Sequence, residues 1–170
     1  MSRDPAAAPS YPELEEVHRL AREAPLRTVA TAESCTGGML AGALSELPGS
    51  SSFFVGGVVA YANSAKVALL GVDPAELTRH GAVSQEVALA LARGVRSLLG
   101  TTLGVSTTGV AGPDGSEHKP PGLIFVALSG PAGEGVRRLE GDRGRRQNRV
   151  EAVRAALQLL LEALRRPPNP

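Results

Sequence analysis

Residues 26–47 read LRTVATAESCTGGMLAGALSEL, and the order of local signals in this stretch decides the fold class. A short run with Val and Thr at residues 26–32 predicts a strand, because β-branched side chains favour extended backbone. The polar segment ESCTGG follows at residues 33–38, and an apolar helical stretch then runs to about Leu47. A strand, a polar turn and a helix in this order form the building unit of α/β proteins.

The segments on either side continue the alternation of helix and strand. Upstream, apolar residues at helical spacing predict a helix over residues 12–24. Downstream, residues 48–52 are a breaker segment, and the continuous apolar run at residues 53–61 predicts a strand that is buried on both faces. Asn63 is then expected to cap a helix that carries Lys66.

The second half of the chain predicts a mixed sheet. Pro74 after Asp73 starts a short helix, and Ser84 is expected to cap a longer helix that ends at Gly100. Further elements are expected at residues 103–108, 123–128 and 136–139 as strands, and at residues 150–164 as an amphipathic helix. Strands alternate with helices at first and follow one another later, so we expect an α/β fold, a single-domain three-layer α/β/α sandwich on a mixed sheet.

The composition fits one folded body and excludes several function classes. At 170 residues with 42% hydrophobic residues, one core is expected over residues 11–166, between disordered tails at residues 1–10 and 167–170. A net charge of +1 and 3% aromatic residues argue against nucleic acid as a partner. No apolar run suits a signal peptide or a membrane span, and the single cysteine, Cys35, forms no internal disulfide, so a cytoplasmic protein is expected.

The segment at residues 32–38 places polar side chains where a strand meets the start of a helix. Free backbone N–H groups at such a helix start can stabilise an oxyanion or a phosphate, which makes Ser34 a candidate nucleophile. The alternative is structural, because Ser34 or Thr36 could cap the helix while Cys35 fills a small space in the core.

A serine nucleophile needs a base, and Lys66 is a better candidate for this base than any of the three histidines. His18, His80 and His118 lie on an exposed-looking helix and in loops, with no acidic partner nearby in sequence. Lys66 lies one turn into a helix that follows a buried strand, and burial lowers the pKa of a lysine until its neutral amine accepts a proton. Tyr61 could relay a proton or hold a substrate ring. A solvated Lys66 and a Tyr61 packed at an interface are the structural alternatives.

Two further segments carry polar or charged groups. The Gly-rich loop at residues 107–115 can form a concave array of N–H donors, or it is simply a long turn with Asp114 and Gly115 at its tip. Six arginines lie between Arg137 and Arg149 with only two acidic residues. Such a cluster suits a phosphate monoester, although a solvated helix start or a nucleic-acid contact has the same composition.

Several long motifs occur here in one order. They are AESCTGG at residues 32–38, LPGSSSFFVGGVVAYANSAKVALLGV at 47–72, HGAVSQEVA at 80–88, TGVAGPDG at 108–115, KPPGLIFVAL at 119–128 and GDR at 141–143. With these motifs the chain resembles the C-terminal domain family of the competence and damage inducible protein CinA, also known as the nicotinamide mononucleotide deamidase family. The resemblance implies hydrolysis of the carboxamide of nicotinamide mononucleotide to ammonia and nicotinate mononucleotide, without a metal or another cofactor.

The resemblance also implies roles for individual residues. Ser34, Tyr61 and Lys66 match the positions of the family's serine, tyrosine and lysine, so they are expected to be catalytic. The substrate-binding residues it implies are Glu33, Cys35, Thr36, Gly37, Gly38, Asn63, Thr108, Gly109, Gly112, Arg143 and Arg149, with Arg146 as the rival of Arg149 for the phosphate. A small-molecule nucleotide substrate and a homo-oligomer, packed through the Gly-rich strand or the first helix, are the expected partners.

Two rival functions belong to other classes. One is a regulatory module that keeps the pocket and binds a nucleotide or a protein without turnover, against which the joint presence of Ser34, Tyr61 and Lys66 argues. The other is a nucleic-acid accessory protein, which would show steeply salt-dependent DNA binding through the arginines at residues 137–149.

Overall fold

A computed structural model describes residues 10–23 and 27–166 of the chain. The expected tails lie outside these ranges apart from Ser10, as do the expected end of the first helix at Ala24 and the start of the first strand at Leu26. The described residues form one five-stranded sheet in the order β2-β1-β3-β4-β5. The strands are β1 (Val29–Glu33), β2 (Phe54–Val59), β3 (Leu103–Gly109), β4 (Ile124–Gly130) and β5 (Gly133–Leu139).

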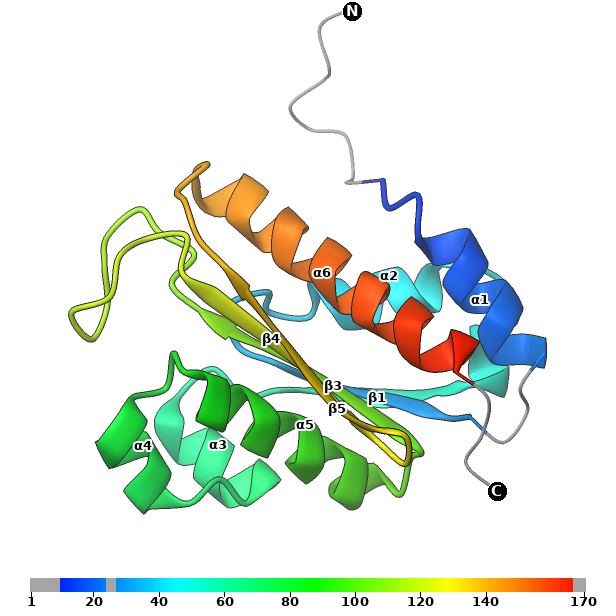
Figure 1. Cartoon of the computed structure of the whole chain (residues 1–170), viewed down its shortest axis with the longest axis horizontal. Coiled ribbons are helices and arrows are strands. Elements are labelled where there is room, and N and C mark those ends of the chain that lie inside the picture. Colours follow the sequence, from blue (N-terminus) through cyan, green and yellow to red (C-terminus); the bar gives the residue numbers. More distant parts are fainter. Residues whose placement is uncertain (1–9, 24–26, 167–170) are drawn as a thin grey trace, which may run out of the picture.

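The sheet is mixed, as predicted, and helices cover both of its faces. β1 pairs in parallel with β2 and β3, whereas β4 is antiparallel to both β3 and β5. Helices α1 (Leu14–Glu23), α2 (Met39–Glu46) and α6 (Arg145–Arg165) lie on one face, and α3 (Asn63–Leu70), α4 (Pro74–His80) and α5 (Gln85–Leu99) lie on the other (Figure 1). The three-layer α/β/α sandwich is therefore confirmed.

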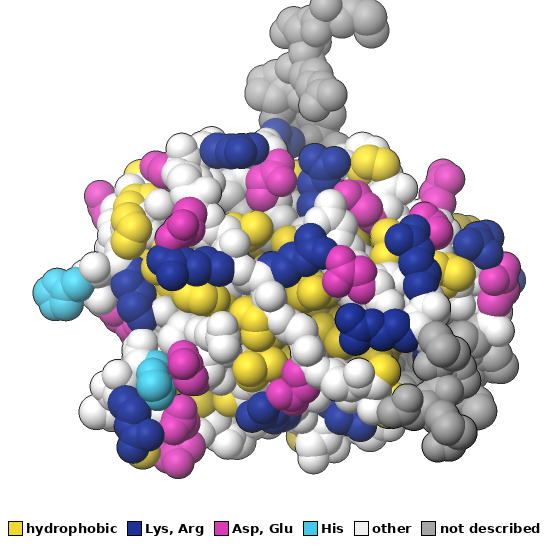
Figure 2. Space-filling view, viewed as in Figure 1, with side chains coloured by type: hydrophobic (Ala, Val, Ile, Leu, Met, Phe, Trp, Pro, Cys, Tyr) yellow, Lys and Arg dark blue, Asp and Glu magenta, His cyan; other side chains and the backbone are white. Residues whose placement is uncertain are grey.

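Each face of the sheet has its own apolar core, because side chains of a strand alternate between the two faces. Val29 packs with Leu40, Phe53 and other residues of the α1, α2 and α6 layer. Ala30 and Ala32, which alternate with it along β1, pack into the layer of α3 and α5. On the surface, Lys and Arg are interspersed with Asp and Glu over the face that carries α6 and β5 (Figure 2).

Helix α5 lies unusually close to its neighbours because two glycines lack side chains. A Cβ built at Gly94 would lie 2.1 Å from the carbonyl oxygen of Leu70. A Cβ at Gly104 of β3 would lie 2.1 Å from the carbonyl oxygen of Ala92. Side chains at these two positions would therefore force α5 away from the sheet.

The helix caps that the sequence predicts are confirmed at several helix ends. The Asp73 side chain accepts a hydrogen bond from Ala75 N at the start of α4, and the Ser84 side chain accepts one from Val87 N at the start of α5. Gly100 ends α5 with a φ of 60°. These ends depend on neighbouring residues alone, which is why the sequence predicts them.

Three sequence-based expectations were wrong. β2 is an edge strand with alternating exposure rather than a strand buried on both faces, because β1 is its only partner. Asn63 does not cap α3 but is its first residue, after Ala62 at the N-cap. His18 is buried, with 5% of its surface exposed, because α1 packs against α2 and α6.

Candidate active site

The carboxyl ends of β1, β2 and β3 meet at one end of the sheet. The chain leaves β1 through α2 on one face to reach β2, and leaves β2 through the helices on the other face to reach β3. Opposite crossovers of this kind open a crevice at the carboxyl ends of parallel strands, where ligands bind in α/β proteins. A cavity of about 360 Å³ lies there and is lined by residues that follow all three strands.

The structure brings together most of the predicted site residues. Those that line the cavity are Ser34, Cys35, Tyr61, Asn63, Lys66, Thr108, Gly109 and Gly112. Those that do not line it are Glu33, Thr36, Gly37, Gly38, Arg143 and Arg149. The cavity therefore draws on the three predicted polar loops, whereas the predicted phosphate arginines lie elsewhere.

Lys66 is buried at the wall of the cavity, with 1% of its surface exposed. Its Nζ donates hydrogen bonds to the carbonyl oxygen of Tyr61 at 2.9 Å and to Asn63 Oδ1 at 3.4 Å. Burial lowers the pKa of the Lys66 amine below its ordinary value, and the negative charge of Glu117 partly opposes this shift. Both hydrogen-bond acceptors are neutral, and the direction of the pKa shift favours the uncharged form that a general base requires.

Ser34 follows β1 directly and is held by the neighbouring strand. Its amide donates to the carbonyl oxygen of Thr107 at 3.0 Å. Within the described ranges its hydroxyl makes no hydrogen bond, and the residue lines the cavity. Ser34 therefore lines the same cavity as Lys66, with a hydroxyl that has no hydrogen-bond partner within the described ranges.

Cys35 also lines the cavity, but its chemistry differs from that of Ser34. The thiol is free and buried. Burial raises its pKa to about 12, although a hydrogen bond with the Thr107 side chain opposes the shift. Because the thiolate is the reactive form of cysteine, Cys35 is a weak nucleophile at neutral pH.

Glu33 stabilises the start of α2 and accepts the hydrogen bonds of backbone amides that could otherwise bind a substrate. Its carboxylate accepts hydrogen bonds from the amides of Gly38, Leu40 and Ala41 at 3.0, 3.0 and 2.8 Å. It also accepts one from the Thr36 hydroxyl at 2.6 Å. The expectation that the start of this helix would hold a substrate anion is therefore wrong for the Gly38 amide, because a buried carboxylate of the chain already accepts its hydrogen bond.

The third loop contributes backbone more than side chains. The Thr108 hydroxyl donates to the carbonyl oxygen of Ala82 at 2.7 Å, so it holds the loop against the start of α5. In the described part of the chain, the amides of Ala111 and Gly112 donate to no backbone oxygen, and both residues line the cavity. These two amides are available to an oxyanion of a bound substrate.

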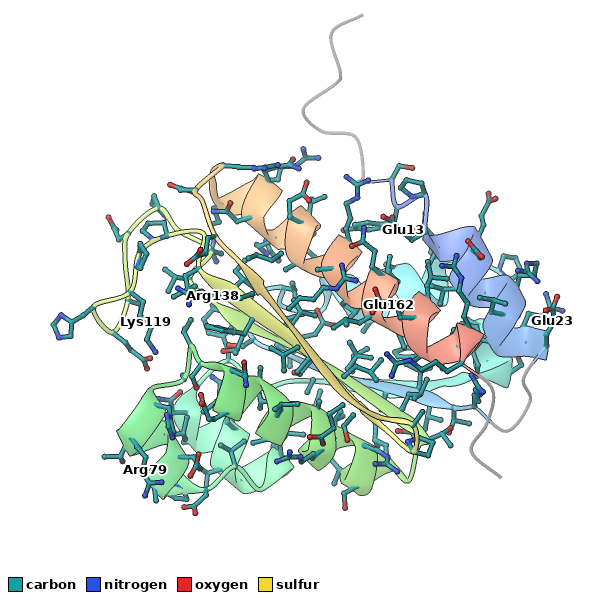
Figure 3. The ribbon with its side chains drawn as sticks, viewed as in Figure 1. Glu13, Glu23, Arg79, Lys119, Arg138 and Glu162 are labelled. Atoms are coloured by element: carbon teal, nitrogen blue, oxygen red, sulfur yellow. The ribbon has the colours of Figure 1, made fainter. Side chains whose placement is uncertain are left out.

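A loop over residues 110–122 forms one wall of the cavity and is tied to the start of α5. Lys119 Nζ donates to the carbonyl oxygens of His80 and Val83, at 2.8 and 2.5 Å. Figure 3 shows Lys119 extending from this loop toward the helical layer below it. Glu117 accepts a hydrogen bond from Val83 N at 3.5 Å and lines the cavity.

The arginine at the cavity is Arg145, which the sequence analysis did not select. Its Nη1 donates to the carbonyl oxygen of Gly112 at 2.8 Å, and its Nη2 donates to the Tyr61 hydroxyl at 3.4 Å. Arg149 instead donates to the carbonyl oxygen of Thr36 at 2.8 Å. The signal that could have found Arg145 is the arginine run itself, because α6 begins at Arg145 and not near residue 150.

Comparison with known proteins places this arrangement in a family. Residues 13–164 match the family model of the CinA C-terminal domain. The chain belongs to that family. It is 50% identical over 140 residues to a putative competence-damage inducible protein of Moorella thermoacetica, covering 81% of this chain and 34% of that protein. It is 51% identical over 144 residues to a CinA-like protein of Frankia casuarinae, covering 84% of this chain and 33% of that protein.

A solved structure of the CinA family has the same fold. The competence/damage inducible protein CihA from Agrobacterium tumefaciens is 40% identical, with a TM-score of 0.83, covering 94% of this chain and all of that one. The chain spans about a third of the length of the curated CinA relatives named above. The names of the Moorella and Agrobacterium proteins refer to competence and damage induction, and the Frankia protein is named only as CinA-like. None of the three names mentions a substrate.

The histidines of this CinA-family domain lie away from the cavity. His18 Nε2 lies 3.0 Å from the carbonyl oxygen of Leu44, and its ring packs edge-on against Phe53. None of the described helices is long and apolar enough to cross a membrane. Among residues 10–23 and 27–166, no group of three or more His, Cys, Asp or Glu side chains is placed to hold a metal ion.

Proposed function

We propose that this chain hydrolyses the carboxamide of nicotinamide mononucleotide to a carboxylate and ammonia, with Ser34 as nucleophile and Lys66 as general base. The single observation that carries the proposal is that Ser34 and a buried Lys66 line the same cavity, the lysine with a lowered pKa. A serine activated by a neutral lysine is an established way to attack an amide. The family supplies the substrate, through the resemblance of its motifs.

The reaction would proceed through an acyl-enzyme. Ser34 Oγ attacks the amide carbon while the neutral Lys66 amine accepts the hydroxyl proton. The resulting ammonium gives this proton to the departing nitrogen, which leaves as ammonia. Water then attacks the ester, again with Lys66 taking the proton, and the carboxylate leaves as Ser34 regains its hydrogen.

Backbone amides would stabilise the oxyanion that forms in this reaction. The amides of Cys35, Ala111 and Gly112 belong to residues that line the cavity and donate to no backbone oxygen within the described ranges. The amides at the start of α2 are excluded, because Glu33 accepts their hydrogen bonds. An oxyanion donor in a site closed to water contributes about 3 to 4 kcal/mol to the barrier reduction.

Arg145 is the side chain that we assign to the 5′-phosphate. It lines the cavity and carries the planar, permanently charged group that binds phosphate in two-point fashion. The Tyr61 hydroxyl accepts a hydrogen bond from Arg145, while Lys66 is bonded to the Tyr61 carbonyl oxygen. Tyr61 is therefore assigned to the phosphate end of the substrate rather than to a proton relay.

The experiment is a measurement of ammonia release by purified protein from nicotinamide mononucleotide and from its riboside. We expect release from the mononucleotide, and a loss of at least about 10³-fold in Ser34→Ala. Ser64→Ala, an exposed serine of α3, is the matched control and should keep full activity. Near-normal turnover by Ser34→Ala would exclude the nucleophile. Absence of release by the parent protein, with thermal stabilisation by the same ligand, would favour a non-catalytic binding module.

A further inference from the structure

The lining of the reaction cavity carries negative charge that the proposed reaction does not use. Asp114 and Glu117 line the cavity from the loop at residues 110–122. The arginine of the lining, Arg145, donates to Gly112 and Tyr61, whereas Glu117 accepts a hydrogen bond from the chain just before α5. Positive and negative charge therefore stand at different places on the lining, as a ligand that carries both charges requires.

The carboxylate of Glu117 lies against the backbone that precedes α5. A Cβ built at Gly81 would lie 2.6 Å from Glu117 Oε2. The same oxygen accepts the 3.5 Å hydrogen bond from Val83 N, and Val83 lines the cavity next to Ala82. The contacts thus place this negative charge at the part of the wall that leads into α5.

Among the described residues, no cation forms an ion pair with Glu117. The Lys119 ammonium stands near the same glycine, but it donates to the carbonyl oxygens of His80 and Val83 instead. Lys119 also exchanges two backbone hydrogen bonds with Ser116, of 3.1 and 2.8 Å, which fold the loop on either side of Glu117. Lys119 therefore holds the loop in place, and the charge of Glu117 stays open to a ligand.

The charge of Glu117 reaches the place where the amide would react. It acts on the Lys66 amine, where it partly opposes the lowering of the pKa by burial. Asp114 also lines the cavity, but it is not among the charges that shift this amine. In a nicotinamide the ring is bonded directly to the amide carbon. A charge that acts on Lys66 therefore also acts on the ring of an amide bound between Lys66 and Ser34.

From these contacts we infer that Glu117 is a specificity-determining residue, which selects amides on a positively charged ring over the same amides on an uncharged ring. The ring nitrogen of nicotinamide mononucleotide carries the ribose and is a pyridinium cation, which a carboxylate at the wall attracts. Reduction to the dihydropyridine removes this charge and leaves the amide, ribose and phosphate in place. The inference rests on the proposed function, because it concerns the ligand of the same cavity.

The test compares the dissociation constants of the oxidised and the reduced mononucleotide, measured by isothermal titration calorimetry at low ionic strength. The full chain carries Ser34→Ala, so that turnover does not consume the ligand. We expect the oxidised form to bind about five- to tenfold more tightly, a modest preference because Glu117 is exposed and water screens its charge. Glu117→Gln in the same background should remove most of this preference, and Glu117→Asp should retain part of it.

The ratio of the two constants separates selection from a structural role of Glu117. Both ligands carry the same ribose and phosphate, so a disordered loop would weaken their binding equally and leave the ratio unchanged. Glu15→Gln, which removes an exposed acid of α1, is the matched control and should keep the ratio of the Ser34→Ala protein.

Two results would overturn the inference. One is equal affinity for the two forms before Glu117 is changed. The other is a preference that survives Glu117→Gln, which would assign the selection to another group, and Asp114→Asn then tests the second carboxylate. A parent protein that releases no ammonia, while the preference is present and depends on Glu117, would contradict the proposed function alone. If neither nucleotide binds, the inference and the proposed function both fail.

Discussion

The two ends of the parallel strands each bury a basic side chain, and the comparison shows what separates a site from a core. At the carboxyl end, Lys66 faces a cavity beside an uncommitted serine. Near the amino end of β2, His18 packs against Phe53 and is hydrogen-bonded to the Leu44 carbonyl oxygen. Burial lowers the pKa of both groups. A perturbed pKa therefore marks a functional site only where the group also reaches a cavity that a ligand can enter.

The largest expected effect is on turnover at the carboxyl end. Lys66→Met should reduce ammonia release by about 10²- to 10⁴-fold, because it removes the general base. Its free energy of unfolding at pH 7 should not fall, since a buried amine is replaced by an apolar chain of similar length. His18→Gln is the matched change at the amino end and should keep the parental kcat. Equal losses in both variants would erase the distinction between the two ends.

The next effect concerns Glu33, which supports the carboxyl end. Glu33→Gln replaces an acceptor of four hydrogen bonds by an amide with one acceptor oxygen, so buried N–H groups lose their partner. We expect the free energy of unfolding to fall by about 2 to 4 kcal/mol in urea titrations. Glu15→Gln, an exposed acid on α1, should change it by less than about 0.5 kcal/mol. A Glu33→Gln protein of unchanged stability would contradict the capping role.

The amino end should respond to pH through His18. Burial lowers its pKa below 6.5, with the Leu44 hydrogen bond opposing the shift. Between the folded pKa and 6.5 the unfolded chain binds more protons, so the free energy of unfolding falls as the pH drops through this window. The loss is at most about 1.4 kcal/mol per pH unit. His18→Gln should lack this component in thermal or urea unfolding from pH 7 to pH 5; identical slopes would disprove it.

The smallest effect compares two arginines of one segment. Arg145→Gln should raise the KM for the mononucleotide about tenfold, equivalent to about 1.4 kcal/mol, with kcat little changed. Arg143, which lines a different hollow, was expected from the sequence to bind phosphate; its change to Gln should leave the KM unaltered. Steady-state kinetics with the mononucleotide and the riboside measure both. A larger KM effect from Arg143→Gln would restore the original assignment.

Much of the fold follows from signals within a few residues. The caps at Asp73 and Ser84 and the stop at Gly100 are local, and the structure has each of them. The edge position of β2 is not local, because the apolar run at residues 53–61 has the same composition whether one neighbour or two lie beside it. Only the order of strands in the sheet decides it.

The candidate site shows the same division. Ser34 and Lys66 were selected because each follows a predicted strand, and strand ends meet in a parallel sheet. The choice between Arg145 and Arg149 depends on where α6 begins and which way each side chain turns from it. Glu33 lies in the same motif as Ser34. The hydrogen bonds that its carboxylate accepts from the amides at the start of α2 depend on the shape of the turn, which the motif does not reveal.

The two glycine contacts of α5 have a practical consequence for redesign of substrate range. Ala82 and Val83, just before α5, form one wall of the cavity, and this helix is already as close to β3 and α3 as backbone atoms permit. That wall is fixed by backbone packing, so side-chain changes along the helix cannot retune it without displacing a whole layer. Engineering toward bulkier amides has to start from the loop at residues 110–122, which contributes Asp114, Ser116 and Glu117 to the lining of the cavity.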